Sequence, residues 1–371
     1  MPSELYIGLM SGTSLDGIDA GLVDFSAGNI KLISFHYQPF SAELRQTINQ
    51  ISQANQAISL LDFGHLDSQL AYLFAEASLA VIKQAQLQPK DIAAIGSHGQ
   101  TVYHAPETQY GFSLQIGDPN RIAELTGITT IADFRRRDIA AGGQGAPLVP
   151  AFHQAVFGSP DQTITVLNIG GIANISILNH DQVLGFDTGP GNTLLDYWHQ
   201  THCNQAYDQD GTWASNGRVN SDLLSQFKQD NYFKLAPPKS TGKEYFSASW
   251  LAQHLKQFQN LQAVDVQATL CQLSADTIAE AINHYAGSSK QVLVCGGGIH
   301  NQSLIKRLQQ QLTMPVISTA EFGLNPDHVE AIAFAWLARQ TLNHLPGNLP
   351  SVTGAKAPVI LGGIYLGNKS A

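Results

Sequence analysis

Residues 5–25, LYIGLMSGTSLDGIDAGLVDF, decide the fold. The apolar run 5–10 predicts a buried strand, residues 11–17 predict a glycine-bearing turn, and apolar residues alternate again from Ile18. Backbone N–H groups beside glycine and the hydroxyls of the turn can hold a phosphate, and its carboxylates can hold the accompanying Mg²⁺. The alternative is a plain hairpin in which Ser, Asp and Gly only reverse the chain.

The same device opens the second half of the chain. Residues 163–178 predict another strand, turn and strand, with Gly170 and Gly171 in the turn. Gly170 lies 158 residues after Gly12. This is an internal repeat of architecture without residue identity, and it predicts two similar lobes. A third glycine turn, Gly296-Gly297-Gly298, stands between an apolar strand and a helix, too late in the chain for a Rossmann fingerprint.

Length and pattern together predict an α/β protein with two lobes. Strand and helix signals alternate, with apolar residues at helical spacing over 66–81 and 270–285. A chain of 371 residues exceeds what one core usually supports, so a cleft between two lobes is expected to hold ligands. We place the N-terminal lobe at 1–140, with the segment from about 350 to 371 returning to it, and the C-terminal lobe at 141–349.

Charge and composition exclude several classes of partner. The net charge of −9 argues against nucleic acid, which favours a basic face. The longest strongly apolar stretch, around 331–338, is far shorter than a bilayer span, so no membrane partner is expected. Three cysteines outside any CxxC spacing and the lack of an export signal predict a cytoplasmic protein.

Asp187 is the candidate catalytic residue. It follows an apolar strand signal and precedes the stiff segment Thr188-Gly189-Pro190-Gly191-Asn192, a setting that suits a general base whose position must be fixed. The alternative is an Asp that only accepts backbone hydrogen bonds in the turn. The cluster Arg135-Arg136-Arg137 suits a small anion, although ion pairing with Asp133 and Asp138 explains it equally well.

These motifs resemble the anhydro-N-acetylmuramic acid kinase family, within the superfamily of actin, sugar kinases and Hsp70. The resemblance lies in residues 8–19, 96–101, 132–150, 168–174, 186–192, 295–301 and 325–333, and it extends from about residue 7 to 365. It implies a two-lobed actin-like ATPase (ribonuclease H-like) fold with an interdomain active-site cleft. The family uses ATP and Mg²⁺ to convert 1,6-anhydro-N-acetylmuramic acid and water into N-acetylmuramic acid 6-phosphate and ADP during peptidoglycan recycling.

The resemblance also assigns roles to residues. Asp187 would activate the water that attacks the anomeric carbon, and the released O6 would attack the γ-phosphate. The ATP site would comprise Gly12, Thr13, Ser14, Leu15, Asp16, Gly17, Ile18, Asp19, Gly170, Gly171, Gly296, Gly297 and Gly298, with Mg²⁺ held by Asp16 or Asp19. The sugar contacts would be drawn from His98, Gln100, Asp118, Arg135, Arg136 and Glu330. The family also suggests a homodimer.

Two other functions stay open on the sequence alone. A sugar kinase of different specificity would share the phosphate turns but need a substrate with a free hydroxyl. A chaperone-like ATPase would hydrolyse ATP without a sugar, and would normally carry an extension for which this chain has little room.

Overall fold

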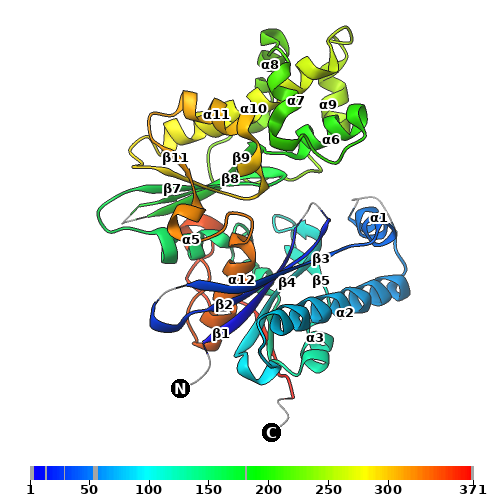
Figure 1. Ribbon diagram of the computed structural model, residues 1–371, viewed down its shortest axis with the longest axis vertical. Helices are drawn as coiled ribbons and strands as arrows, with labels where there is room; N and C mark the ends of the chain where they lie inside the picture. Colours follow the sequence, from blue (N-terminus) through cyan, green and yellow to red (C-terminus); the bar gives the residue numbers. More distant parts are fainter. Residues whose placement is uncertain (1–3, 13–14, 29, 53–56, 180–181, 369–371) are drawn as a thin grey trace. The chain divides into compact units, whose positions relative to one another are not determined.

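The computed structural model describes residues 4–12, 15–28, 30–52, 57–179 and 182–368 (Figure 1). It divides into two compact units, one formed by residues 1–152 and 328–371 and the other by residues 153–327. The Thr13 and Ser14 assignments fall outside the described residues. Helices of the described residues include none with the length and apolar character needed to cross a membrane.

Unit 1 is built on a mixed sheet with strand order β12-β6-β4-β1-β2-β3, and β5 pairs with β4. Its strands are β1 (Leu5–Ser11), β2 (Gly17–Asp24), β3 (Lys31–Pro39), β4 (Ala94–Ala105), β5 (Phe112–Ile116), β6 (Thr130–Ala132) and β12 (Gly363–Tyr365). Its helices are α1 (Ala42–Ile51), α2 (Leu60–Gln84), α3 (Pro119–Thr126), α4 (Phe134–Ala140), α12 (Val329–Leu342) and α13 (Pro350–Thr353), and α5 (Val149–Phe157) leads into unit 2.

Two helices cover opposite faces of this sheet (Figure 1). Ile7 and Leu9 of β1 join the core cluster that contains Leu70 and Phe74 of α2. Gly8, between them, faces α12, where a Cβ on it would stand 1.7 Å from the Ala331 carbonyl oxygen. Successive residues of β1 therefore face α2 and α12 in turn. Only glycine at position 8 allows α12 to approach the strand this closely.

Unit 2 repeats the topology of unit 1. Its strands β7 (Ile164–Ile169), β8 (Ile172–Leu178), β9 (Val183–Pro190), β10 (Val292–Cys295) and β11 (Val316–Ser318) have the order β11-β10-β7-β8-β9. In both units the first three strands are antiparallel, and the first strand pairs in parallel with the next strand on its other side. This duplicated order confirms the predicted α/β class and the actin-like, ribonuclease H-like fold.

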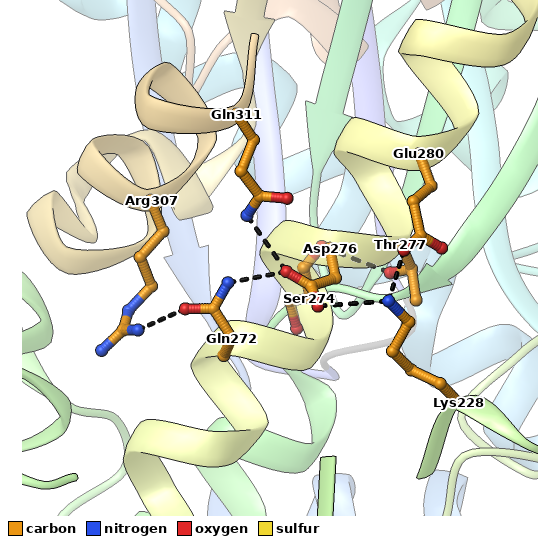
Figure 2. Close-up of polar contacts among 8 residues, drawn as sticks. All are labelled: Lys228, Gln272, Ser274, Asp276, Thr277, Glu280, Arg307 and Gln311. Atoms are coloured by element: carbon orange, nitrogen blue, oxygen red, sulfur yellow. Dashed lines mark hydrogen bonds and ion pairs between the residues drawn. The ribbon is translucent and has the colours of Figure 1, made fainter. Parts of the chain in front are cut away.

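The helices of unit 2 pack around α10 (Ala263–Tyr285), which carries an almost continuous buried face. They are α6 (Thr193–Cys203), α7 (Thr212–Asn216), α8 (Ser221–Lys228) and α11 (Gln302–Gln311), while α9 (Ala248–Leu255) packs on α6 and α8. The Asp276 carboxylate of α10 accepts from Gln272, Gln311 and Lys228, and so joins α10 to α11 and α8 (Figure 2). Because several donors share one carboxylate, this network braces the helical layer above β9.

The boundaries between the units differ from those predicted near residues 140 and 349. The chain returns to unit 1 at His328, because α12 must cover β1 and β4. Residues 348–353 belong to unit 1 as well, since buried Asp138 of α4 accepts from Asn348 at 2.6 Å and from Thr353 at 2.8 Å. The first crossing falls within α5, after the predicted boundary near residue 140.

Candidate active site

Gln100 and Ser11 meet at the carboxyl end of β1. Strand β4 runs on to Ala105, so the polar residues 96–101 are part of the strand. In that register Gln100 lies opposite Ser11, and the Ser11 Oγ lies 2.7 Å from the Gln100 Oε1 and 2.9 Å from the Gly17 carbonyl oxygen. Gln100 Nε2 also donates to the Gly12 carbonyl at 3.4 Å. Gln100 thus stabilises the start of the first glycine turn through hydrogen bonds to Ser11 and Gly12, a role that the sequence did not predict.

His98, two residues earlier on β4, is paired with Arg135. The Arg135 Nε and Nη2 lie 3.1 and 2.9 Å from His98 Nε2, and Nη1 donates to the Gly145 carbonyl at 2.8 Å. Burial, and then Arg135, lower the pKa of His98 to about 3, so the imidazole is neutral and accepts from the guanidinium. Burial also lowers the pKa of Arg135 to about 10, while Glu330 and Asp138 oppose the shift.

All six predicted sugar contacts lie in unit 1, and the structure joins three of them: His98 pairs with Arg135, and Glu330 acts on Arg135. Gln100 supports the first glycine turn, and the remaining two also have structural partners. Asp118 is the N-cap of α3 and accepts from the Asn120 amide at 2.9 Å. Arg136 is exposed and forms a two-point ion pair with Asp133.

Among the described residues 15–19, the carboxylates of Asp16 and Asp19 are exposed or half-exposed, whereas the apolar side chains are buried. Leu15 and Ile18 are buried in the core of unit 1, so only their backbone groups are available to a ligand. The carboxylates of Asp16 and Asp19 both act on Tyr37, whose pKa is raised by burial first and then by these two charges. Mg²⁺ takes one or two carboxylates beside the phosphates, and Asp16 and Asp19 are carboxylates of the required kind.

The second glycine turn is joined to the end of β9. The N–H groups of Asn192 and Thr193 donate to the carbonyls of Gly170 and Gly171 at 2.9 and 3.0 Å, at the start of α6. A Cβ on either glycine would meet no described atom closer than 3.6 Å. Packing therefore does not require glycine here, and the open space suits a ligand near a helix N-terminus.

The third glycine turn approaches the end of β7. A Cβ on Gly296 would stand 2.3 Å from the Asn168 Oδ1, and one on Gly298 would stand 2.2 Å from the Ile169 side chain, whereas one on Gly297 would meet nothing. Beyond the turn lies a cavity of about 500 Å³ within unit 2. Its lining includes Ile299, His300, Ser318, Gly323, Pro326 and Asp327.

Asp187 lies inside β9, which continues to Pro190, and not at the strand end that the sequence predicted. Its Oδ2 accepts from the Thr241 N–H at 2.9 Å, and its own N–H donates to the Lys239 carbonyl at 3.2 Å. Burial raises the pKa of Asp187 to about 7, and Glu244 adds to the shift, while Thr241 and Lys239 oppose it. A carboxyl group with this pKa is suited to proton transfer near neutral pH.

The sequence missed two features of this region. Segment 239–241 contacts Asp187 directly, and the sequence does not indicate this contact because partners 54 residues apart leave no periodic signal. Asp196 in the first turn of α6 also has its pKa raised to about 7, by burial and then by Asp208. Asp196 is therefore a second carboxyl to be tested as a base.

Duplicated ribonuclease H-like units, glycine turns at the ends of their first strands and a half-buried carboxyl group of raised pKa are the features of the actin-like class of nucleotide-dependent proteins. The sequence model of the anhydro-N-acetylmuramic acid kinase family matches residues 4–367. The chain belongs to this family.

Curated relatives support the same assignment. Proteins named anhydro-N-acetylmuramic acid kinase are 50% identical over 363 residues in Pasteurella multocida, covering 97% of this chain and 96% of the relative, and 50% identical over 365 residues in Vibrio cholerae, covering 98% of each. The relative of that name in Coxiella burnetii is 48% identical over 374 residues, covering 100% of this chain and 99% of its own length. The predicted family and kinase activity are thereby confirmed.

Proposed function

We propose that this enzyme hydrolytically opens the 1,6-anhydro ring of 1,6-anhydro-N-acetylmuramic acid and transfers the γ-phosphoryl group of ATP to O6. The products are N-acetylmuramic acid 6-phosphate and ADP, which places the reaction in peptidoglycan recycling. The observation that carries the proposal is the Asp187 carboxyl group, fixed by a backbone N–H and poised with a pKa of about 7.

The chemistry needs such a base because the substrate has no free 6-hydroxyl group. Asp187 takes a proton from water as the water oxygen bonds to the anomeric carbon, and the electron pair of the breaking C1–O6 bond passes to O6. O6 then bonds to the γ-phosphorus as the bond to the β-phosphate oxygen breaks. Ring opening and phosphoryl transfer are thus two parts of one reaction.

Other residues bind and orient the substrates. Residues 12–19 and Gly170-Gly171 hold the phosphates, and the 296–298 turn with the cavity beyond it receives adenosine. Asp16 or Asp19 would hold Mg²⁺, which would neutralise charge on the transferring phosphoryl group. For the sugar, Arg135 is the candidate partner of the lactyl carboxylate, supported by neutral His98 and by Glu330.

The test is ADP release from ATP and Mg²⁺ with each of several sugars. The proposal requires turnover with 1,6-anhydro-N-acetylmuramic acid and little with N-acetylmuramic acid, N-acetylglucosamine or no sugar. Turnover with a sugar that has a free 6-hydroxyl group would keep the kinase assignment and overturn the ring-opening step. Equal ADP release without any sugar would favour an ATPase.

A further inference from the structure

Asp187 is held from outside its own sheet by residues 239–241. Two hydrogen bonds of opposite direction join them: the Asp187 N–H donates to the Lys239 carbonyl, and the Thr241 N–H donates to the Asp187 Oδ2. The segment therefore runs beside β9 at the one position where β9 carries a carboxylate. Among the described residues, the Asp187 Oδ1 accepts no hydrogen bond.

The Lys239 side chain is anchored at the same place. Its Nζ lies 4.7 Å from the centroid of the Tyr232 ring and donates to the Tyr232 carbonyl at 3.3 Å. Tyr232 is fixed in turn, because its hydroxyl donates to the Asp187 carbonyl at 2.8 Å. Lys239, Tyr232 and Asp187 thus form one connected group within unit 2.

The ionisable groups that act on Asp187 are Lys239 and Glu244 from the 239–244 segment and Tyr232 from the short helix Asn231–Lys234. Of these, only Lys239 favours the ionised carboxylate. Burial lowers the pKa of Lys239 and Asp187 raises it, so the two groups interact in both directions. Glu244 acts against ionisation of Asp187.

We propose that residues 239–241 are the positioning segment of the catalytic base. The Thr241 N–H fixes Oδ2, which leaves Oδ1 to take the proton from water, and the Lys239 ammonium group favours the ionised form of this half-buried carboxyl group. The inference rests on the proposed role of Asp187, and it adds two positioning residues that do not themselves contact the reacting atoms.

The first test replaces the charge of Lys239. Lys239→Met keeps an unbranched side chain against Tyr232 but removes the cation, so the acidic limb of the kcat/KM profile should move to higher pH by about one unit. Activity should recover on the alkaline plateau, and Lys239→Arg should restore the original limb. An unmoved limb in Lys239→Met, or an equal loss at every pH, would overturn the role of Lys239.

The second test removes the hydrogen bond from the backbone. Thr241→Pro eliminates the N–H, while the matched control Thr241→Ala keeps it. We expect kcat to fall about 100-fold in Thr241→Pro, the scale of a positioning defect, with the KM for ATP nearly unchanged and Thr241→Ala close to the parent enzyme. Equal kcat in the two folded variants would overturn the role of Thr241. If Thr241→Pro does not fold, the Lys239 variants decide the proposal.

Asp187→Asn separates this inference from the proposed function. Full turnover in Asp187→Asn would show that Asp187 is not the base, and both proposals would fail. If Asp187→Asn is inactive but the acidic limb of the kcat/KM profile does not move in Lys239→Met, Asp187 remains the base. Only the role of residues 239–241 as its positioning segment would then be rejected.

Discussion

The Asp187 carboxyl group is half-buried and hydrogen-bonded, and its chemistry can be tested by replacing the carboxyl group with an amide that cannot ionise. Asp187→Asn should lower kcat at least ~10³-fold while ATP binding stays within a few-fold, because general-base catalysis is lost and Asp187 is not among the phosphate contacts. ADP release and calorimetric ATP binding measure the two effects. The same substitution at Asp196 tests the other carboxyl group of raised pKa. A larger loss there than at Asp187 would reassign the base.

The pKa of Asp187 also predicts how activity depends on pH. Because the base must be ionised, kcat/KM should rise with pH and reach a plateau above about 7. Initial rates between pH 5.5 and 8.5 with saturating ATP and Mg²⁺ measure this limb. A profile that is flat from pH 5.5 upward would contradict the assignment.

The raised pKa of Asp187 also predicts that this residue lowers the stability of the protein at the pH where it acts as a base. The folded-state pKa of Asp187 is raised from 3.8 to about 7, so its favourable contribution to stability is complete below the unfolded pKa and is lost as pH rises through 7. Asp187→Asn should therefore unfold at a higher temperature than the parent at pH 8, with a smaller difference at pH 5.5. Thermal unfolding at the two pH values decides this. A lower Tm for the variant at pH 8 would contradict it.

Elements with a regular period could be predicted from the sequence, whereas those fixed by distant partners could not. The hairpin β7–β8 and helix α2 follow from apolar periodicity and glycine turns. The extension of β4 does not follow from periodicity, because polar residues such as His98 and Gln100 are typical of a loop. They lie in the interior only because Arg135 and Ser11, distant in the sequence, form hydrogen bonds with them. The hydrogen bond from Thr241 to Asp187 is hidden for the same reason, since nothing local in either segment specifies the other.

The packing of α12 on β1 makes a further prediction for these elements. Gly8→Ala would place a methyl group 1.7 Å from a backbone oxygen and 2.6 Å from the Ala335 nitrogen, atoms that move only if α12 moves. We expect the free energy of unfolding to fall by about 3 kcal/mol. The control is Gly64→Ala in α2, where no described atom lies within 4 Å of the new Cβ, and where we expect a gain of roughly 0.5–1 kcal/mol. Urea unfolding measures both changes. Equal free energies of unfolding for Gly8→Ala and Gly64→Ala would contradict the close packing of α12 on β1.

At the scale of the whole chain, one topology occurs twice and the residues assigned to the reaction are divided between the copies. Unit 1 holds the His98–Arg135 pair and the first glycine turn, and unit 2 holds Asp187 and the other two turns. The division was predictable from the paired glycine turns. The return of the chain at His328 was not, because a helix that is apolar on every side does not reveal which sheet it covers.

This arrangement predicts that the two units differ in autonomy. The main core cluster of unit 2 draws only on residues 167–316, so a fragment of residues 153–327 should fold alone and unfold cooperatively in urea. It contains Trp198, Trp213 and Trp250, three of the four tryptophans, which report the transition by fluorescence. A chain ending at residue 327 should keep that transition while unit 1 stays unfolded, because β1 and β4 have lost α12. Rapid amide exchange throughout β1 and β4 of this truncated chain, with protection retained in β7 and α10, is the expected result. Protection of β1 without residues 328–371 would show that unit 1 does not depend on the returning helix.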